Sequence, residues 1–249
     1  MLAFSSLLGN VEGQNIYRIW YDKPASYWEE ALPVGNGRIA AMVFGDPQLE
    51  QIQLNEETVS AGSPYQNYNE EAKTALPEMR RLIFEGKYEE AQNMATTKIL
   101  SQVGNEMPYQ TVGRLNIRYQ DHKKVNNYYR DLDISNAVAV TRYKVDGVEF
   151  TEETFASFTD QLVIRHIKAS KPGAINCELF FNTPMRDPKR SIYGKKGLRL
   201  EGITHGSRYF PGKVHYCADL DVKHKGGKGI TANDTLLSVK GARELTLSI

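Results

Sequence analysis

Cysteine is scarce in this sequence, and several other features are missing. Two cysteines in 249 residues cannot form a disulfide framework, so the fold has to depend on a hydrophobic core. No apolar run reaches the roughly 20 residues that a membrane-spanning helix needs. Charge of one sign is also lacking, because 31 basic residues balance 30 acidic ones. We therefore expect no nucleic-acid and no membrane partner, since both are bound through clustered positive charge.

The first 15 residues form a segment of their own. Residues 2–8 (LAFSSLL) are apolar, and Val11 and Gly13 suit the −3 and −1 positions of a signal-peptidase site before Gln14. The basic residues that usually begin a signal peptide are absent. Residues 1–15 are thus either the remnant of a secretion signal or a disordered extension. The first alternative predicts a periplasmic or extracellular protein.

From Val138 onward, strand patterns alternate with turn signals. Asp146-Gly147 suits a type I′ hairpin turn, and Lys171-Pro172-Gly173 marks a second turn after which the next strand runs back. The expected strands are 138–145, 148–158, 161–168, 174–182, 198–203, 214–223, 236–239 and 244–249. Such spacing predicts a mainly β fold, a large antiparallel β-sandwich.

One stretch has the period of helices. Over residues 69–100, apolar residues recur every three or four positions, with Pro77 suited to a first helical turn and Gly86 to a C-terminal stop. This predicts a short helical hairpin inserted among the strands. We expect it to cap an end of the sandwich or to cover one face.

Two chemical motifs fail on context, so we expect no cofactor and no metal. Residues 35–40 (GNGRIA) match the dinucleotide pattern G-x-G-x-x-A, but Pro33 interrupts the approach and no helix follows. His215, Cys217, Asp219 and Asp221 share one face of a strand, yet neighbours on that face lie about 7 Å apart, too far to enclose one ion. Their positions are typical of a solvent-facing side.

The sequence leaves open whether the two cysteines form a disulfide. Cys177 and Cys217 could form a disulfide if their strands are neighbours, and buried free thiols are the default alternative.

Paired acids raise the question of glycoside hydrolysis. The adjacent pairs are Glu29-Glu30, Glu56-Glu57, Glu70-Glu71, Glu89-Glu90 and Glu152-Glu153. Hydrolysis needs two carboxyl groups that converge from different elements, whereas neighbours in a strand point in opposite directions. We expect most of these acids on the solvated surface and predict no catalytic residue in this chain.

A set of polar and aromatic residues near the N-terminus is the best candidate site. It consists of Trp28, Asn36, Arg38, Asn55 and Glu56. Aromatic rings, amides and a guanidinium are the usual means of holding a sugar. The alternative is that Trp28 lies in the core or an interface, while Asn36 and Arg38 tie loops together by hydrogen bonds.

Several motifs, in order along the chain, resemble the start of glycoside hydrolase family 95, which contains α-L-fucosidases and α-L-galactosidases. They are 20–25 (WYDKPA), 28–38 (WEEALPVGNGR), 41–45 (AMVFG), 52–58 (IQLNEET), 108–110 (PYQ), 113–115 (GRL), 129–133 (YRDLD) and 155–161 (FASFTDQ). The resemblance extends from about residue 16 to residue 249.

The resemblance implies that residues 16–249 are the family's N-terminal β-sandwich domain, of the super-sandwich kind. In that family an (α/α)6 barrel follows and carries the acid and the water-activating residues of an inverting hydrolysis. The sequence ends before any barrel helices, so we expect the isolated chain to be inactive. The implied partners are the C-terminal barrel of the same polypeptide and fucosylated oligosaccharides. An independent carbohydrate-binding module and a purely structural scaffold remain as alternatives.

The same resemblance gives the candidate residues a role. Trp28, Asn36, Arg38, Asn55 and Glu56 are expected at the domain interface or at the rim of the substrate site.

Overall fold

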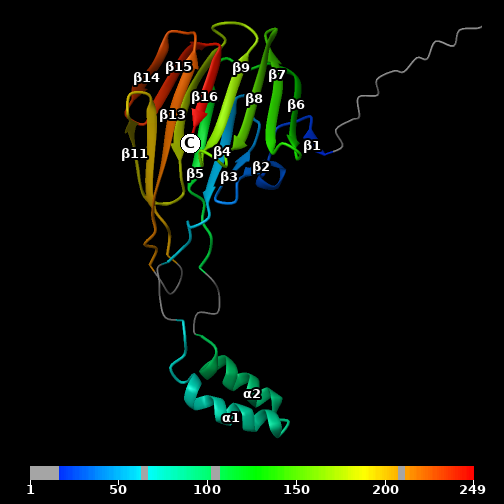
Figure 1. The fold of residues 1–249 in the computed structure, drawn as a ribbon, viewed down its shortest axis with the longest axis vertical. Helices are drawn as coiled ribbons and strands as arrows, with labels where there is room; N and C mark the ends of the chain where they lie inside the picture. Colours follow the sequence, from blue (N-terminus) through cyan, green and yellow to red (C-terminus); the bar gives the residue numbers. More distant parts are fainter. Residues whose placement is uncertain (1–16, 63–66, 102–106, 207–210) are drawn as a thin grey trace, which may run out of the picture.

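The described part of the chain is a β-sandwich with a helical hairpin attached (Figure 1). The computed structural model describes residues 17–62, 67–101, 107–206 and 211–249. The signal remnant or extension predicted for residues 1–15 therefore lies outside the described residues. Two antiparallel sheets pack face to face, which confirms the predicted mainly β, sandwich-like fold.

The nine-stranded sheet is called sheet A. Its strands, in spatial order, are β1 (Arg18–Tyr21), β6 (Val125–Asp133), β7 (Val138–Val145), β8 (Val148–Ala156), β9 (Val163–Ala169), β16 (Glu244–Ser248), β13 (His215–Lys225), β12 (Gly197–Ile203) and β11 (Arg186–Tyr193). The seven-stranded sheet B has the order β14 (Gly229–Asn233), β15 (Leu236–Ala242), β10 (Ile175–Asn182), β5 (Gly113–Tyr119), β4 (Leu49–Glu56), β3 (Ile39–Val43) and β2 (Leu32–Gly35).

Alternation along the strands builds the core between the two sheets. On β9 every second residue from Val163 to Ala169 is buried, and on β10 every second residue from Ile175 to Phe181 is buried. These side chains belong to one continuous apolar cluster that spans both sheets. The hairpin predicted at Asp146-Gly147 is confirmed, since both residues have positive φ, 47° and 73°, as a type I′ turn requires.

One predicted connection is wrong. The chain does not return beside β9 after the turn at residues 171–173, because β9 belongs to sheet A and β10 to sheet B. Of the strands that follow Val138, two, β11 and β14, were also not predicted. Both are edge strands with few buried residues, so they lack the apolar alternation that marks an inner strand.

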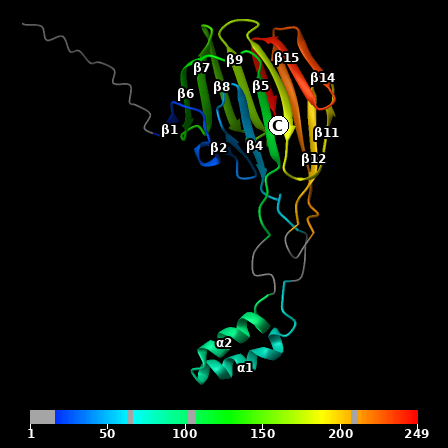
Figure 2. The ribbon, with the colours of Figure 1, turned by 180° about the vertical axis from the view of Figure 1, so that it is seen from behind.

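The helical hairpin consists of α1 (Ala72–Phe84) and α2 (Tyr88–Met94), followed by a π-helical turn, η2 (Ala95–Ile99). Figures 1 and 2 show it apart from the sandwich from both sides, so the expectation that it caps or covers the sheets is wrong. Its few buried residues are Ala75, Leu82 and Ala91, and α1 contacts α2 and η2. No helix of the described residues is long and apolar enough to cross a membrane.

Gly86 and Pro77 were predicted to mark helix ends, and the structure confirms this for Gly86 alone. Gly86 ends α1 as predicted, with a φ of 75° and a hydrogen bond from the Lys87 amide to the Leu82 carbonyl that satisfies the helix end. Pro77 lies inside α1, not in its first turn. It therefore removes an amide donor from the helix interior.

Candidate functional site

The candidate site begins at the turn between β2 and β3. Asn36 is buried, and its Oδ1 accepts hydrogen bonds from the backbone amides of Arg38 (3.1 Å) and Ile39 (2.9 Å). Gly37 between them has a φ of 93°, which glycine adopts without strain. The G-x-G motif is thus a hairpin turn between antiparallel strands, and no helix opens there.

The sequence suggested that Pro33 interrupts the approach to this turn, but the structure shows a strand there. Pro33 lies within β2, opposite Met42 of β3. The strand tolerates proline because β2 is the edge of sheet B, where a missing amide donor leaves no neighbour unsatisfied.

The Asn36 side chain also reaches across to sheet A. Its Nδ2 donates to the carbonyl of Ser157, at 2.8 Å, and to Oε1 of Gln161, at 3.4 Å. One asparagine therefore fixes the β2–β3 turn to the loop between β8 and β9.

A pocket of about 270 Å³ opens beside this turn. Arg38, Asn55 and Glu56 line it from sheet B. The opposite wall comes from Gln161, Leu162, Val163, Cys217, Ala218, Asp219 and Ile249. The pairing of β13 with β16 stops at Asp221 and Ser248, so residues 217–219 extend past the end of β16 and face this space.

Glu56 and Arg38 form an ion pair at the mouth of the pocket. Arg38 Nε lies 3.3 Å from Glu56 Oε1, and the Thr58 amide donates to Glu56 Oε2 at 2.8 Å. Partial burial acts to raise the pKa of Glu56, but the hydrogen bonds from Thr58 and Arg38 outweigh it and hold this pKa below its usual value. Glu56 is therefore an ionised acceptor at neutral pH.

On the far wall, Asp219 is held by Arg199 of β12. Arg199 Nε and Nη2 donate to the two carboxylate oxygens, at 2.7 and 2.6 Å. Burial first, and then the nearby Asp219 charge, raise the pKa of the Cys217 thiol. Both carboxyl groups that line the pocket thus bond to guanidinium groups, an arrangement suited to holding a polar ligand or a partner surface.

The five predicted residues are distributed as follows. Arg38, Asn55 and Glu56 meet at the pocket, and Asn36 supports it from within. Trp28 does not line the pocket. It lies on the short 3-10 helix η1 (Trp28–Glu30) with half of its surface exposed, in a segment that Arg130 anchors through the carbonyls of Lys23 and Glu30.

Sequence reasoning missed the pocket's second wall. Gln161, Asp219 and Ile249 are distant from Arg38 in sequence and meet it only through sheet packing. The strand pattern placed Cys217 and Asp219 on a solvent-facing side, which is where they lie. Within the described residues no group of His, Cys, Asp and Glu is arranged to hold a metal ion.

The two thiols are both free. Cys177 is buried in sheet B, whereas Cys217 lies on sheet A and is exposed, so their strands are not neighbours. The expectation of buried thiols therefore holds for Cys177 alone.

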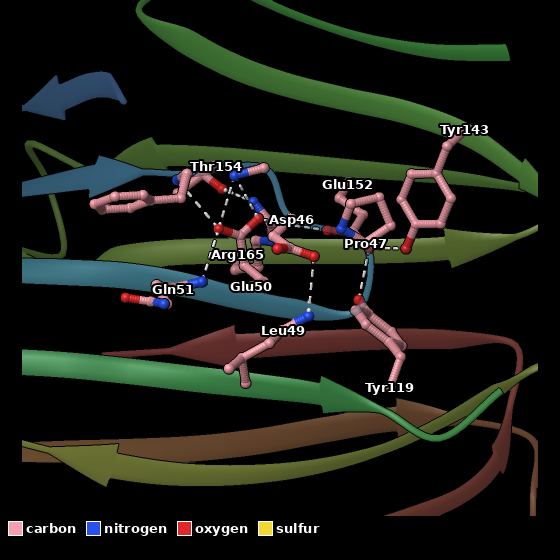
Figure 3. Close-up of polar contacts among 12 residues, drawn as sticks. Asp46, Pro47, Leu49, Glu50, Gln51, Tyr119, Tyr143, Glu152, Thr154 and Arg165 are labelled. Atoms are coloured by element: carbon pink, nitrogen blue, oxygen red, sulfur yellow. Dashed lines mark hydrogen bonds and ion pairs between the residues drawn. The ribbon is translucent and has the colours of Figure 1, made fainter. Parts of the chain in front are cut away.

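A second polar cluster lies in the core, where Figure 3 shows it between the sheets. Glu50 of β4 and Glu152 of β8 both contact Arg165 Nη2 of β9. Tyr119 and Tyr143 each donate to Glu152 Oε1 at 2.6 Å. No sequence pattern indicated this cluster, and Glu152 is buried, unlike the solvated surface position expected of most paired acids. Because all three charged residues are buried, the cluster joins the sheets and offers no access to a substrate.

The sequence matches one family profile and is similar to several known proteins. The profile described as "Glycosyl hydrolase family 65, N-terminal domain" matches residues 19–249. The chain is 37% identical over 181 residues to "Alpha-L-fucosidase 2" of Arabidopsis thaliana, covering 70% of this chain and 21% of that protein. It is 26% identical over 166 residues to "Probable alpha-fucosidase A" of Aspergillus niger, covering 61% of this chain and 20% of the relative.

A solved structure, "Putative kojibiose phosphorylase from human microbiome", aligns with 93% of this chain and 32% of its own, at 11% identity and a TM-score of 0.43. The chain thus spans about a fifth of the length of the curated relatives it matches. The expected N-terminal domain of a glycoside hydrolase is confirmed at this level, while the matching profile carries the number 65, not 95. Because this profile covers nearly the whole chain, the chain belongs to the family described as glycosyl hydrolase family 65, N-terminal domain.

Proposed function

We propose that this chain is the non-catalytic N-terminal β-sandwich domain of a family 95-like glycoside hydrolase. The whole protein would hydrolyse terminal α-L-fucosyl or α-L-galactosyl linkages with inversion. The acid and the water-activating residues would come from an (α/α)6 barrel of the same polypeptide. The sandwich would pack against that barrel and support it.

One observation carries the proposal: an N-terminal domain profile matches nearly the whole chain, while the matched part is only about a fifth of the similar proteins named as fucosidases. Most of each relative lies outside the matched part. The match to "Alpha-L-fucosidase 2", the most similar of those above at 37% identity, favours fucose as the sugar.

The pocket beside the β2–β3 turn is the part of the domain that we assign to the interface with the barrel. Arg38 is largely exposed, with 59% of its side-chain surface free, and presents a guanidinium beside Asn55 and Glu56. Ile249 forms part of the same pocket, so a segment that followed it would begin at this surface.

The proposal is tested by reading the source gene beyond the codon for Ile249 and assaying two proteins with p-nitrophenyl α-L-fucoside and α-L-galactoside. One is the product of the whole reading frame, and the other is the 249-residue chain. We expect the first to hydrolyse the fucoside faster and the second to show no turnover. Hydrolysis by the 249-residue chain, or a reading frame that lacks paired helices downstream, would overturn the proposal.

A further inference from the structure

The outer face of sheet B carries a groove that is separate from the pocket beside the β2–β3 turn. We propose that this groove binds an acidic oligosaccharide, one that bears uronic-acid carboxylates. It is called the Asn182 groove, after the residue at its centre. The inference is independent of the proposed function, since it uses a different face of the molecule.

The groove consists of two adjoining hollows of about 300 and 330 Å³ that share Asn182. The first hollow is lined by Gln53 of β4 and Arg114 of β5, and the second by Phe180 of β10 and Arg190 of β11. Each has room for roughly ten water molecules at about 30 Å³ each, more than one small inorganic anion fills.

Strand register makes the groove continuous. Gln53 lies opposite Arg114, and Arg114 lies opposite Asn182, so the three side chains form a row across β4, β5 and β10. Arg190 extends this row from sheet A, because its Nη2 lies 3.5 Å from Asn182 Oδ1. Amides and guanidinium groups thus alternate along the groove.

Two of the guanidinium groups have only neutral partners. Arg114 donates to Gln51 Oε1 at 2.8 Å and lies over the Phe44 ring, and Arg190 donates to the Phe181 carbonyl at 3.0 Å. Neither forms an ion pair within the described ranges of the chain. By contrast, Arg118 in the second hollow is paired with Glu178 at 3.2 Å. Two uncompensated positive charges therefore flank Asn182.

This combination favours a sugar acid. A guanidinium binds a carboxylate through two parallel hydrogen bonds, which makes Arg114 and Arg190 suitable for uronic-acid groups. Side-chain amides both donate and accept, so Gln53 and Asn182 match the hydroxyl groups of a sugar. Phe180 and Leu236 add an apolar wall for the C–H face of a ring.

The test is calorimetric titration of the 249-residue chain with trigalacturonic acid at low ionic strength. Maltotriose serves as the neutral sugar and citrate as a carboxylate without a sugar. We expect a Kd of about 1 mM or tighter for the sugar acid alone, weakened at least about tenfold in Arg114→Ala, which removes a charged hydrogen-bond donor. Arg114→Lys, which keeps the charge but loses the planar fork, should lie between the two.

Arg80→Ala is the matched control, because it removes an exposed positive charge from α1. It should leave the Kd unchanged. Failure to bind trigalacturonic acid, equal binding of citrate, or equal affinity in Arg114→Ala and the unmodified chain would each overturn the proposal. Far-UV circular dichroism of each variant separates loss of binding from loss of folding.

Discussion

Arg165 of sheet A and Glu50 of sheet B form an ion pair through the middle of the core, with 2.8 Å between Nη2 and Oε2. Neither side chain has any exposed surface. The same guanidinium contacts Glu152, and its Nη1 donates to Thr154 at 2.7 Å. A buried charge that loses its partner keeps its full desolvation cost, so this cluster is a sensitive point of the fold.

Replacing Arg165 should therefore destabilise the chain strongly. In Arg165→Met we expect the free energy of unfolding in urea to fall by about 3–5 kcal/mol, because two carboxyl groups remain buried without a cation. The matched control is Arg80→Met on the exposed side of α1, for which about 0.5 kcal/mol or less is expected. Adding Glu50→Gln to Arg165→Met should recover part of the loss. A loss below about 1 kcal/mol would contradict the role assigned to the pair.

Stability should also depend on pH through Glu50. Burial raises the pKa of Glu50 from 4.5 to about 7, despite the opposing effects of Arg165 and the Gly45 amide. The folded state then binds more protons than the unfolded state over this range, so the contribution of Glu50 to stability decreases as pH rises from about 4.5 to 7.

The test of this effect compares urea unfolding of the unmodified chain and Glu50→Gln between pH 5 and pH 8. Burial lowers the pKa of His122, which gives an opposite slope in both proteins and cancels in the comparison. We expect the stability of the variant, relative to the unmodified chain, to increase with pH. A difference that stays constant across the range would show that Glu50 does not titrate there.

Arg38 should contribute differently in the isolated chain and in the whole protein. In the 249-residue chain its exposed ion pair with Glu56 should stabilise by only about 0–1 kcal/mol, so Arg38→Ala should unfold almost normally. If the pocket is a domain interface, the same substitution in the whole protein should cost about 2 kcal/mol or more in stability, or lower the activity. Unchanged melting and unchanged kinetics in the whole protein would count against the interface.

Asn36 should matter in the isolated chain as well. Its side chain makes four hydrogen bonds, two within the β2–β3 turn and two that join this turn to Ser157 and Gln161. Asn36→Ala should lower the free energy of unfolding by about 1–3 kcal/mol, because buried backbone groups lose their partners. Asn233→Ala, at the exposed end of β14, is the control and should have little effect. Equal stability of the two variants would contradict this role.

Local patterns were sufficient to predict much of the fold. Alternation over residues 138–145 and the Asp146-Gly147 turn determine a hairpin, because side-chain period and positive φ act between near neighbours. The helical period over residues 69–100 and the stop at Gly86 are local in the same sense. The position of the helical hairpin relative to the sheets was not predictable, because its few apolar contacts lie between its own helices.

The sequence by itself determined a mainly β chain, the turn at Asp146-Gly147 and the helical segment over residues 69–100. Only the tertiary structure decided that β10 leaves the sheet of β9, that Glu152 points into the core, and that Asp219 and Ile249 complete the pocket. The two-residue alternation of side chains along a strand indicates which residues share a face. It does not report which sheet that face meets, because strand pairing and burial join residues that are far apart in the chain.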